Sequence, residues 1–323
     1  MPPLDWNVLD LDYATEADRI AAQLREGLAS QLHRRGLIVA ISGGIDSSVC
    51  AALAVRAVGA QRVLCLILPE RDSDPDSAER AQLLVDHLGV NVERFDIAPA
   101  LEALGCYSAR DDAVRRVLPE YTRSWKMKLS IVGARQGTIN RFRLIAQDDA
   151  GVLHERELRL NDYLTIVAAT SFKQRTRKML EYFHADRLNY AVVGTPNRLE
   201  FDQGFFVKNG DGAADIKPIA HLYKSQVYAM ARYLGLPERL CNAQPTTDTY
   251  SLEQGQDEFY FALPYRSMDL ALWAIDHDVP AQDLGRVLGL DAAEVEAVYK
   301  DIQGKRRTTR YLHLPPITLI GAP

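Results

Sequence analysis

The sequence predicts an α/β protein with a doubly wound, mostly parallel sheet, helices on both faces and an inserted β-hairpin. Residues 37–41 and 62–68 are short, uninterrupted apolar runs, which are typical of strands buried on both faces. Helical patterns over 46–58 and 78–88 follow these two runs, and residues 90–97 form a third strand-like segment. Because strand–helix–strand units cross over with a right hand, this order predicts neighbouring parallel strands.

The remaining segments predict further elements within a single domain that spans residues 1–323. Alternating charge on both sides of an Asp/Gly turn at 148–151 predicts an exposed hairpin in an insertion over about 130–165. Residues 263–316 form a C-terminal helical part. The expected helices are 10–35, 99–104, 111–128 (interrupted near Pro119), 171–183, 225–234, 263–278, 281–288 and 292–300, and 190–194 is a further strand.

Composition limits the classes of function. The formal net charge of −5 gives no electrostatic reason to expect nucleic acid as the main ligand. No run approaches 18 apolar residues, and the N-terminus lacks the pattern of a secretory signal, so we expect no membrane contact. The four cysteines show no zinc-binding spacing, which favours a reduced, cytoplasmic protein.

A loop of unusual chemistry follows the first predicted strand. It reads Ser42-Gly43-Gly44-Ile45-Asp46-Ser47-Ser48 and leads into an alanine-rich helix. Glycines at a strand-to-helix turn let backbone N–H groups approach an anion, and the helix N-terminus adds its partial positive charge. Asp46 is placed to hold a divalent cation against phosphates. The simpler alternative is a Gly-Gly turn with serine and aspartate caps.

Two further segments carry charge without an evident role in a core. The helix 171–183 is rich in lysine and arginine, which fits either a solvated face or a phosphate-bearing ligand. Residues 194–226 mix carboxylates, glycines and lysines with no helical or strand periodicity until Leu222. A segment of this kind indicates a binding loop.

These motifs together resemble a known family. The Ser-Gly-Gly-x-Asp-Ser loop resembles that of the ATP pyrophosphatases, and the second cluster is similar to NAD synthetases. The second similarity rests on Glu200, then Gly-Phe-Phe-x-Lys-x-Gly-Asp-Gly-x-Ala-Asp-x-x-Pro over 204–218, then Leu-x-Lys-x-Gln over 222–226. It extends to residues 245–248, 257–258, 264–265 and 313–316. The resemblance implies an adenine nucleotide alpha hydrolase-like fold.

The resemblance also implies a reaction. ATP would adenylate the nicotinate carboxylate of deamido-NAD and release pyrophosphate, and ammonia would then displace AMP to give NAD. Mg²⁺ would be the cofactor, a homodimer would bind the dinucleotide near its interface, and ammonia would be free or delivered by a separate glutaminase.

Each implied role falls on a residue of this sequence. Asp46 and Glu200 would be Mg²⁺ ligands, and Lys224, Thr246 and Asp211 would be catalytic. The ATP-binding residues would be Ser42, Gly43, Gly44, Asp46, Ser47, Ser48, Leu68, Lys224 and Thr246. Arg175, Phe205, Lys208 and Asp215 would bind the second substrate.

Several departures leave other functions open. Ser171 stands where the family usually has Asn, Ala262 stands near a usual Gly, and the 130–165 insertion lies outside the common pattern. A related amide ligase acting on another carboxylate therefore stays an alternative. A tRNA-modifying pyrophosphatase is disfavoured by the net charge and by the lack of cysteine pairs.

Overall fold

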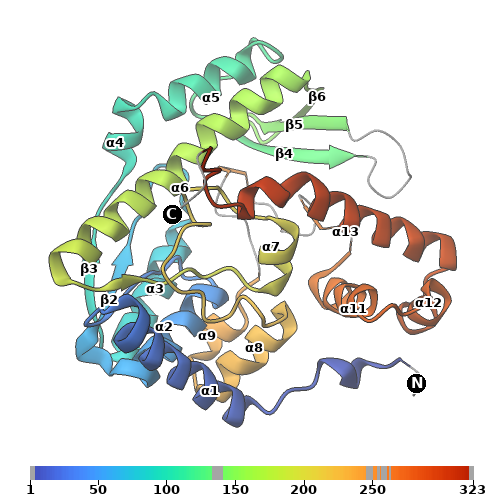
Figure 1. Ribbon diagram of the computed structural model, residues 1–323. Helices are drawn as coiled ribbons and strands as arrows, with labels where there is room; N and C mark the ends of the chain where they lie inside the picture. The colour runs from blue at the N-terminus through green and yellow to red at the C-terminus, as the bar shows by residue number, and fades with distance from the viewer. Residues whose placement is uncertain are drawn as a thin grey trace.

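The fold was taken from a computed structural model, which describes residues 4–132, 141–244, 250–252, 255, 260–261 and 263–319 (Figure 1). The strands are β1 (Leu37–Ala40), β2 (Val63–Ile67), β3 (Asn91–Arg94), β4 (Lys126–Val132), β5 (Arg141–Gln147), β6 (Leu153–Glu157) and β7 (Ala191–Val192). The helices before β7 are α1 (Tyr13–Glu26), α2 (Ile45–Val58), α3 (Pro75–Leu88), α4 (Ala98–Ala103), α5 (Cys106–Arg115) and α6 (Leu160–Leu188). Those after it are α7 (Arg198–Gln203), α8 (Lys224–Tyr233), α9 (Glu238–Cys241), α11 (Tyr265–Asp276), α12 (Ala281–Leu288) and α13 (Ala292–His313).

The central sheet is parallel, with strand order β3-β2-β1-β7. Leu37 of β1 is in register with Val63 of β2 on one side and with Ala191 of β7 on the other. The chain therefore winds outward from β1 to β3 and returns to the opposite side of β1. Open α/β sheets bind ligands where the strand order reverses, beyond the carboxyl ends of the strands. Here that point lies between β1 and β7.

Helices cover both faces of this sheet because its strands alternate between two buried sides. Leu37, Val39 and Cys65 belong to an apolar cluster shared with α1, α2, α3 and α8. Ile38 and Leu66 belong to a second cluster, which includes side chains of α4, α5 and α6. The predicted doubly wound fold is confirmed.

A second, antiparallel sheet of order β4-β5-β6 lies beside the N-terminal part of α6 (Figure 1). Gln147 pairs with Leu153 across the turn that follows β5, as the predicted hairpin requires. The prediction of a helix over 111–128 is wrong at its C-terminal end. Residues 126–132 form β4, because Met127 and Leu129 alternate with polar neighbours and bury their side chains under the sheet.

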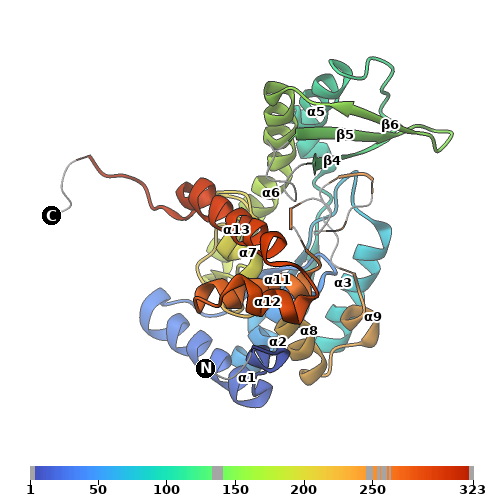
Figure 2. The same cartoon turned by 90° about the vertical axis from the view of Figure 1, so that its right-hand side faces the viewer.

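The C-terminal helices pack together around a third apolar cluster (Figure 2). The last predicted helix, 292–300, continues to His313, so the basic stretch 303–310 is helical. Arg306 of this stretch pairs with Asp202 of α7 at 2.8 Å. Beyond α13 the chain extends away from the body (Figure 2). None of the helices in the described ranges has the length and hydropathy of a membrane span.

Candidate active site

The glycine loop connects β1 to the first turn of α2. Gly43 has a φ of +76°, and a Cβ at this position would lie 2.3 Å from the carbonyl oxygen of Ser77 in α3. The loop is also held from inside, because the Ser42 backbone N–H donates to the Ser47 hydroxyl at 3.3 Å. Within the described chain, no side chain caps the first turn of α2. Its N–H groups are therefore placed to meet an anion.

Two carboxylates from distant segments meet at one lysine. Lys224 Nζ forms a short ion pair with Asp46 and lies 3.8 Å from Glu200 Oε1. Lys224 begins α8 and is 2 % exposed. Asp46 lies in the first turn of α2, and Glu200 lies in the first turn of α7. Asp46 and Glu200, the two predicted Mg²⁺ ligands, thus lie beside the same lysine, and their role as metal ligands stays a prediction.

Electrostatics hold this lysine in its charged form. Burial lowers the pKa of Lys224, but the carboxylates of Asp46 and Glu200 outweigh this effect and raise the pKa well above its usual value. The lysine is therefore a permanent cation at neutral pH. It can stabilise negative charge and cannot act as a base.

Asn197 organises the same corner and was missed by the sequence analysis. Its side-chain oxygen accepts the Glu200 N–H at 3.1 Å, while its Nδ2 donates to Asp46 Oδ1 at 2.9 Å. The Asn197 side chain is fully buried. It therefore caps α7 and orients Asp46 at once. The pattern Asn-x-x-Glu just after a strand is a capping box, which the sequence alone could have indicated.

Asp269 of α11 supports Lys224 from below. Its two carboxylate oxygens accept the backbone N–H groups of Lys224 and Ser225 at 3.2 and 2.7 Å. This carboxylate caps the N-terminus of α8 together with Gln226, whose side chain accepts the Tyr223 N–H at 2.9 Å. Burial raises its pKa to about 6.

A cavity of 650 Å³ opens beside these groups. Volumes of this size are typical of sites for small molecules and cofactors. The predicted residues that line it are Ser42, Gly43, Gly44, Asp46, Ser47, Leu68, Glu200, Phe205, Asp211 and Lys224. The two motif clusters meet here because one follows β1 and the other follows β7.

One face of α6 also lines the cavity. The face includes Tyr163, Thr170, Gln174, Arg177 and Lys178, which recur at helical spacing. Arg177 Nε donates to the carbonyl of Leu68 at 3.1 Å and so joins the helix to the end of β2. Arg177 and Lys178 are cationic lining residues that the sequence analysis placed only within a basic helix.

A cluster of acidic and basic side chains, Lys178, Glu181 and Asp211, also lines the cavity. Lys178 Nζ pairs with Glu181 at 2.6 Å, and Asp211 accepts the Val207 N–H at 2.7 Å. Burial raises the pKa of Asp211, and the Val207 hydrogen bond and the Lys178 charge oppose this effect. Asp211 is therefore a carboxylate whose proton affinity is higher than usual.

Four predicted site residues do not line the cavity. The Ser48 hydroxyl donates to the Gly44 carbonyl at 2.8 Å inside the α2 turn. Asp215 accepts the Val192 N–H at 2.7 Å beside the sheet. Arg175 Nε contacts the Lys208 carbonyl at 3.3 Å, and Lys208 Nζ contacts the Tyr311 carbonyl at 2.8 Å. Arg175 is exposed and does not line the cavity, although Gln174 before it and Lys178 one turn after it do. Thr246 lies outside the described residues.

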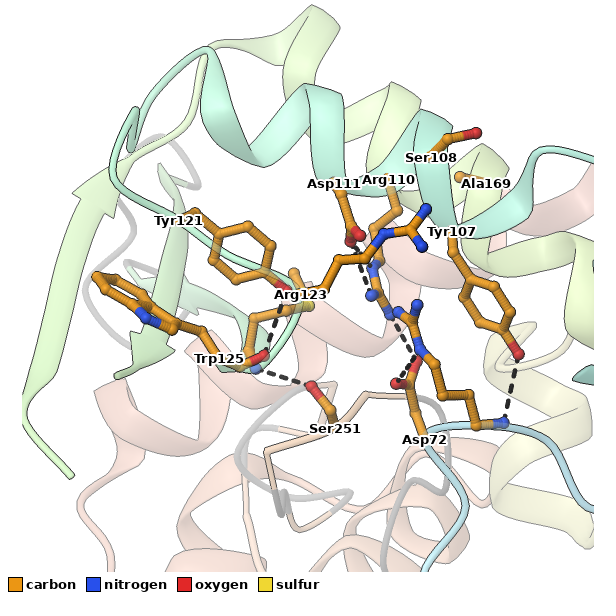
Figure 3. Close-up of polar contacts among 12 residues, drawn as sticks. Asp72, Tyr107, Ser108, Arg110, Asp111, Tyr121, Arg123, Trp125, Ala169 and Ser251 are labelled. Atoms are coloured by element: carbon orange, nitrogen blue, oxygen red, sulfur yellow. Dashed lines mark hydrogen bonds and ion pairs between the residues drawn. The ribbon is translucent and has the colours of Figure 1, made fainter. Parts of the chain in front are cut away.

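The loop after β2 is held by a buried ion-pair network. Lys173 Nζ contacts Glu70 at 2.9 Å and Asp72 at 2.8 Å. Asp72 also pairs with Arg110 at 2.5 Å, and Tyr107 donates to Glu70 at 2.8 Å. Figure 3 shows Arg110 and Asp72 beside Tyr107 under α5. This network fixes the loop 68–74 against α5 and α6, and Glu70 lines the cavity.

Both the sequence and the fold are similar to those of known proteins. A family model for NAD synthase matches residues 16–120 and 147–310. The chain belongs to the NAD synthase family. The family match leaves out residues 121–146, which include β4 and most of β5.

Relatives and solved structures agree with this placement of the NAD synthase chain. A protein of Rhizobium meliloti described as NH(3)-dependent NAD(+) synthetase is 55 % identical over 96 % of this chain and 93 % of its own. The Thermotoga neapolitana protein of the same description is 34 % identical over 94 % of this chain and 96 % of its own.

The solved structures resemble the fold at lower identity. The NH3-dependent NAD synthetase of Campylobacter jejuni has a TM-score of 0.62 at 21 % identity, over 96 % of this chain and 100 % of its own. An NMN synthetase of Francisella tularensis has a TM-score of 0.66 at 22 % identity, over 96 % of this chain and 99 % of its own. The predicted family and fold are therefore confirmed.

Proposed function

We propose that this enzyme forms the carboxamide of NAD from deamido-NAD, ATP and ammonia. The proposal follows from the family together with one observation: Asp46, Glu200 and Lys224 converge on a cavity that begins at the glycine loop. A carboxylate is a poor acyl donor because its oxygen is a poor leaving group. Adenylation converts that oxygen into part of AMP, and ammonia can then displace it.

The glycine loop would bind the phosphates of ATP. The uncapped first turn of α2 presents N–H groups, and the Ser42 and Ser47 hydroxyls line the same cavity. In the adenylation step, a carboxylate oxygen of deamido-NAD attacks the α-phosphorus while the bond to the β-phosphate oxygen breaks. The charge that develops on pyrophosphate would be met by Lys224 and the loop N–H groups.

The residues around Lys224 fit a magnesium ion. Mg²⁺ is usually held by one or two carboxylates together with substrate phosphates, so a set of two carboxylates is sufficient. Asp46 and Glu200 both line the cavity, and the buried ammonium group of Lys224 lies beside both carboxylates. When bound, Mg²⁺ would neutralise phosphate charge at this corner. Thr246 is proposed beside them on the family resemblance alone.

The second step needs neutral ammonia. Asp211 is the carboxylate we assign to take a proton from incoming ammonium, since burial gives it a raised pKa and it lines the cavity. The nitrogen then attacks the acyl carbon, and the bond to the AMP oxygen breaks. Asp211→Asn should slow aminolysis while leaving pyrophosphate release at its original rate. An unchanged aminolysis rate would remove Asp211 from this role.

A homodimer is proposed from the outer face of α6. Arg175, Met179 and Phe183 follow one another at intervals of four residues and share this face. Met179 and Phe183 are 62 % and 58 % exposed. A second copy packed here would cover both apolar side chains and bring Arg175 and Lys208 to the interface. The two residues could then contact the dinucleotide there. Phe183→Glu should give a monomer in light scattering.

Pyrophosphate release tests the function directly. The protein is mixed with ATP and Mg²⁺, with and without deamido-NAD, and then with ammonium or glutamine as nitrogen source. We expect pyrophosphate only when deamido-NAD is present, and NAD only with ammonium. A mononucleotide bearing the same nicotinate group replaces deamido-NAD in a parallel sample. Release that depends on the mononucleotide, or on neither substrate, would refute the proposal.

A further inference from the structure

The outer edge of the inserted sheet, formed by β4, hydrogen-bonds to a distant segment of the chain. Among the strands that the structure describes, β4 is paired with β5 alone, at one edge of the order β4-β5-β6. On its other side, the Met127 N–H donates to the Ser251 hydroxyl at 2.9 Å. The Leu252 N–H donates to the Met127 carbonyl at 3.1 Å. Both backbone groups of one β4 residue therefore hold a segment that lies 124 positions away in the sequence.

The segment is also anchored by its neighbouring aromatic side chain. Tyr250 is 6 % exposed and belongs to the apolar cluster of the inserted sheet, with Met127, Leu129 and Leu144. These partners come from two strands of the insert, so the ring is seated in the core of that sheet. Figure 3 shows Ser251 directly beneath the loop that carries Tyr121 and Trp125 into β4.

Tyr250 is at the same time part of the cavity wall. It lines the cavity next to Tyr163 and Thr170 of α6. The phenol is strongly desolvated: burial raises the pKa of Tyr250 well above its usual value, and a hydrogen bond to Thr170 opposes this. One side of this side chain therefore faces the site, while its support comes from a sheet that the family match partly leaves out.

We propose that the inserted sheet is a positioning element for the active site. Its β4 edge and apolar core hold residues 250–252 so that Tyr250 completes the cavity wall beside Tyr163 and Thr170 of α6. Ser251 is then a positioning residue that acts through Tyr250. The proposal rests on the proposed function only in its choice of substrates. An insertion at the periphery of the fold thus determines how tightly the site binds its ligands.

The first experiment removes the hydrogen bond to β4. Ser251→Ala should raise the Kd for ATP, or the KM for deamido-NAD, about three- to tenfold, because one hydrogen bond of ordinary strength is lost. The value of kcat should change less than twofold. Ser251→Thr keeps the hydroxyl and should restore binding. Ser108→Ala is the matched control, since the Ser108 hydroxyl donates to the Gly105 carbonyl at the start of its own helix at 3.2 Å and not to the inserted sheet.

The second experiment perturbs the support without touching the cavity. Leu144→Ala, on β5, opens a void in the cluster that seats Tyr250. Leu284→Ala, on α12, opens a comparable void in the C-terminal cluster. Both side chains are fully buried, so both variants should lower Tm. Only Leu144→Ala should weaken ligand binding, measured at a temperature where both variants are folded.

The outcomes separate this inference from the proposed function. Unchanged Kd and KM in both Ser251→Ala and Leu144→Ala would overturn the positioning role, even if the enzyme makes NAD. Equal weakening by Leu144→Ala and Leu284→Ala would overturn it too, because the effect would then follow stability alone. A wild-type protein that binds ATP but releases no pyrophosphate with deamido-NAD would refute the proposed function, and the calorimetric Kd for ATP would still test the positioning role.

Discussion

Asn197 Nδ2 donates to Asp46 Oδ1 over 2.9 Å and thereby joins the two loops on either side of the sheet's reversal point. Asp46 follows β1, and Asn197 follows β7. The same Asn197 side chain caps α7 and so places Glu200. One amide therefore sets the relative position of the two carboxylates that we assign to Mg²⁺.

Asn197→Ala should reduce both stability and activity. Loss of the α7 cap should lower the free energy of unfolding by about 1 kcal/mol. Because Asn197 is fully buried, the total loss of stability should be larger than this value. Asp46 would also lose its orienting donor, so kcat should fall at least about tenfold, equal to 1.4 kcal/mol. Asn197→Asp retains the cap but sets a second negative charge beside Asp46. If urea unfolding and initial rates match the wild type in both variants, Asn197 has no such role.

Gly43→Ala should abolish ATP binding and destabilise the protein. An added Cβ would meet the Ser77 carbonyl at 2.3 Å, and φ is positive as well. Gly59→Ala is a control for the second effect. Its φ is +82°, but a Cβ there meets no heavy atom within 4 Å in the described structure. Gly59→Ala should cost about 1–3 kcal/mol in stability, because its φ of +82° with a ψ of 150° is a conformation that glycine almost alone adopts, and it should leave the Kd for ATP unchanged. Equal effects of the two substitutions would show that close packing against α3 is unimportant.

Asp269 should make stability depend on pH between about 4 and 6. Its pKa is raised from 3.8 to about 6 in the folded protein, so the native state binds the proton more tightly than the unfolded state. The contribution is therefore greatest below pH 4 and is lost as pH rises through 6, by up to about 3 kcal/mol. Asp269→Asn removes this titration. Free energies of unfolding in urea at several pH values should show a flatter profile for the variant across this window. Parallel profiles would contradict the assignment.

Lys173→Met should be severely destabilising. It leaves Glu70 and Asp72 without their shared buried counter-charge, a change that typically costs 3–5 kcal/mol. Arg56→Met is the contrasting control, because Arg56 and Asp18 form a surface pair worth less than about 1 kcal/mol.

Lys173→Met should also change how the free energy of unfolding falls at acid pH. Burial raises the pKa of Asp72, but the charges of Lys173 and Arg110 outweigh burial and hold it far below its usual value. Its stabilising contribution is therefore present above pH 4 and is lost as pH falls. Lys173→Met should lose less stability than the wild type between pH 5 and pH 3. Identical acid limbs would show that Lys173 does not control this carboxylate.

The sequence identified the parts of the site that follow strands. Apolar runs locate β1 and β2. The glycine loop, residues 42–48, follows the first run directly, so its position at the carboxyl end of β1 was predictable from the sequence. The family resemblance located Glu200 and Lys224. Their contact with Asp46 depends on β7 lying beside β1, which no local pattern reveals.

The errors have equally physical origins. Arg175 and Lys178 are three positions apart on one helix, and composition cannot tell which of them faces the cavity; the packing of α6 on the sheet decides this. Helix α6 also begins at Leu160, well before the predicted start, because its N-terminal turns pack on the inserted sheet. The predicted helix over 111–128 includes the first three residues of β4, because the two-residue alternation over 126–132 is too short to give a strong strand signal.

The pairing of Leu37 with Ala191 has a consequence for folding. Strands β1, β2 and β3 are close in sequence and can associate early, whereas β7 pairs with β1 across nearly half of the chain. A species with only the first three strands formed would hold the glycine loop and lack Asn197, Glu200 and Lys224. Pulse-labelling hydrogen exchange should therefore protect β1 and β2 amides before ATP-binding competence appears during refolding.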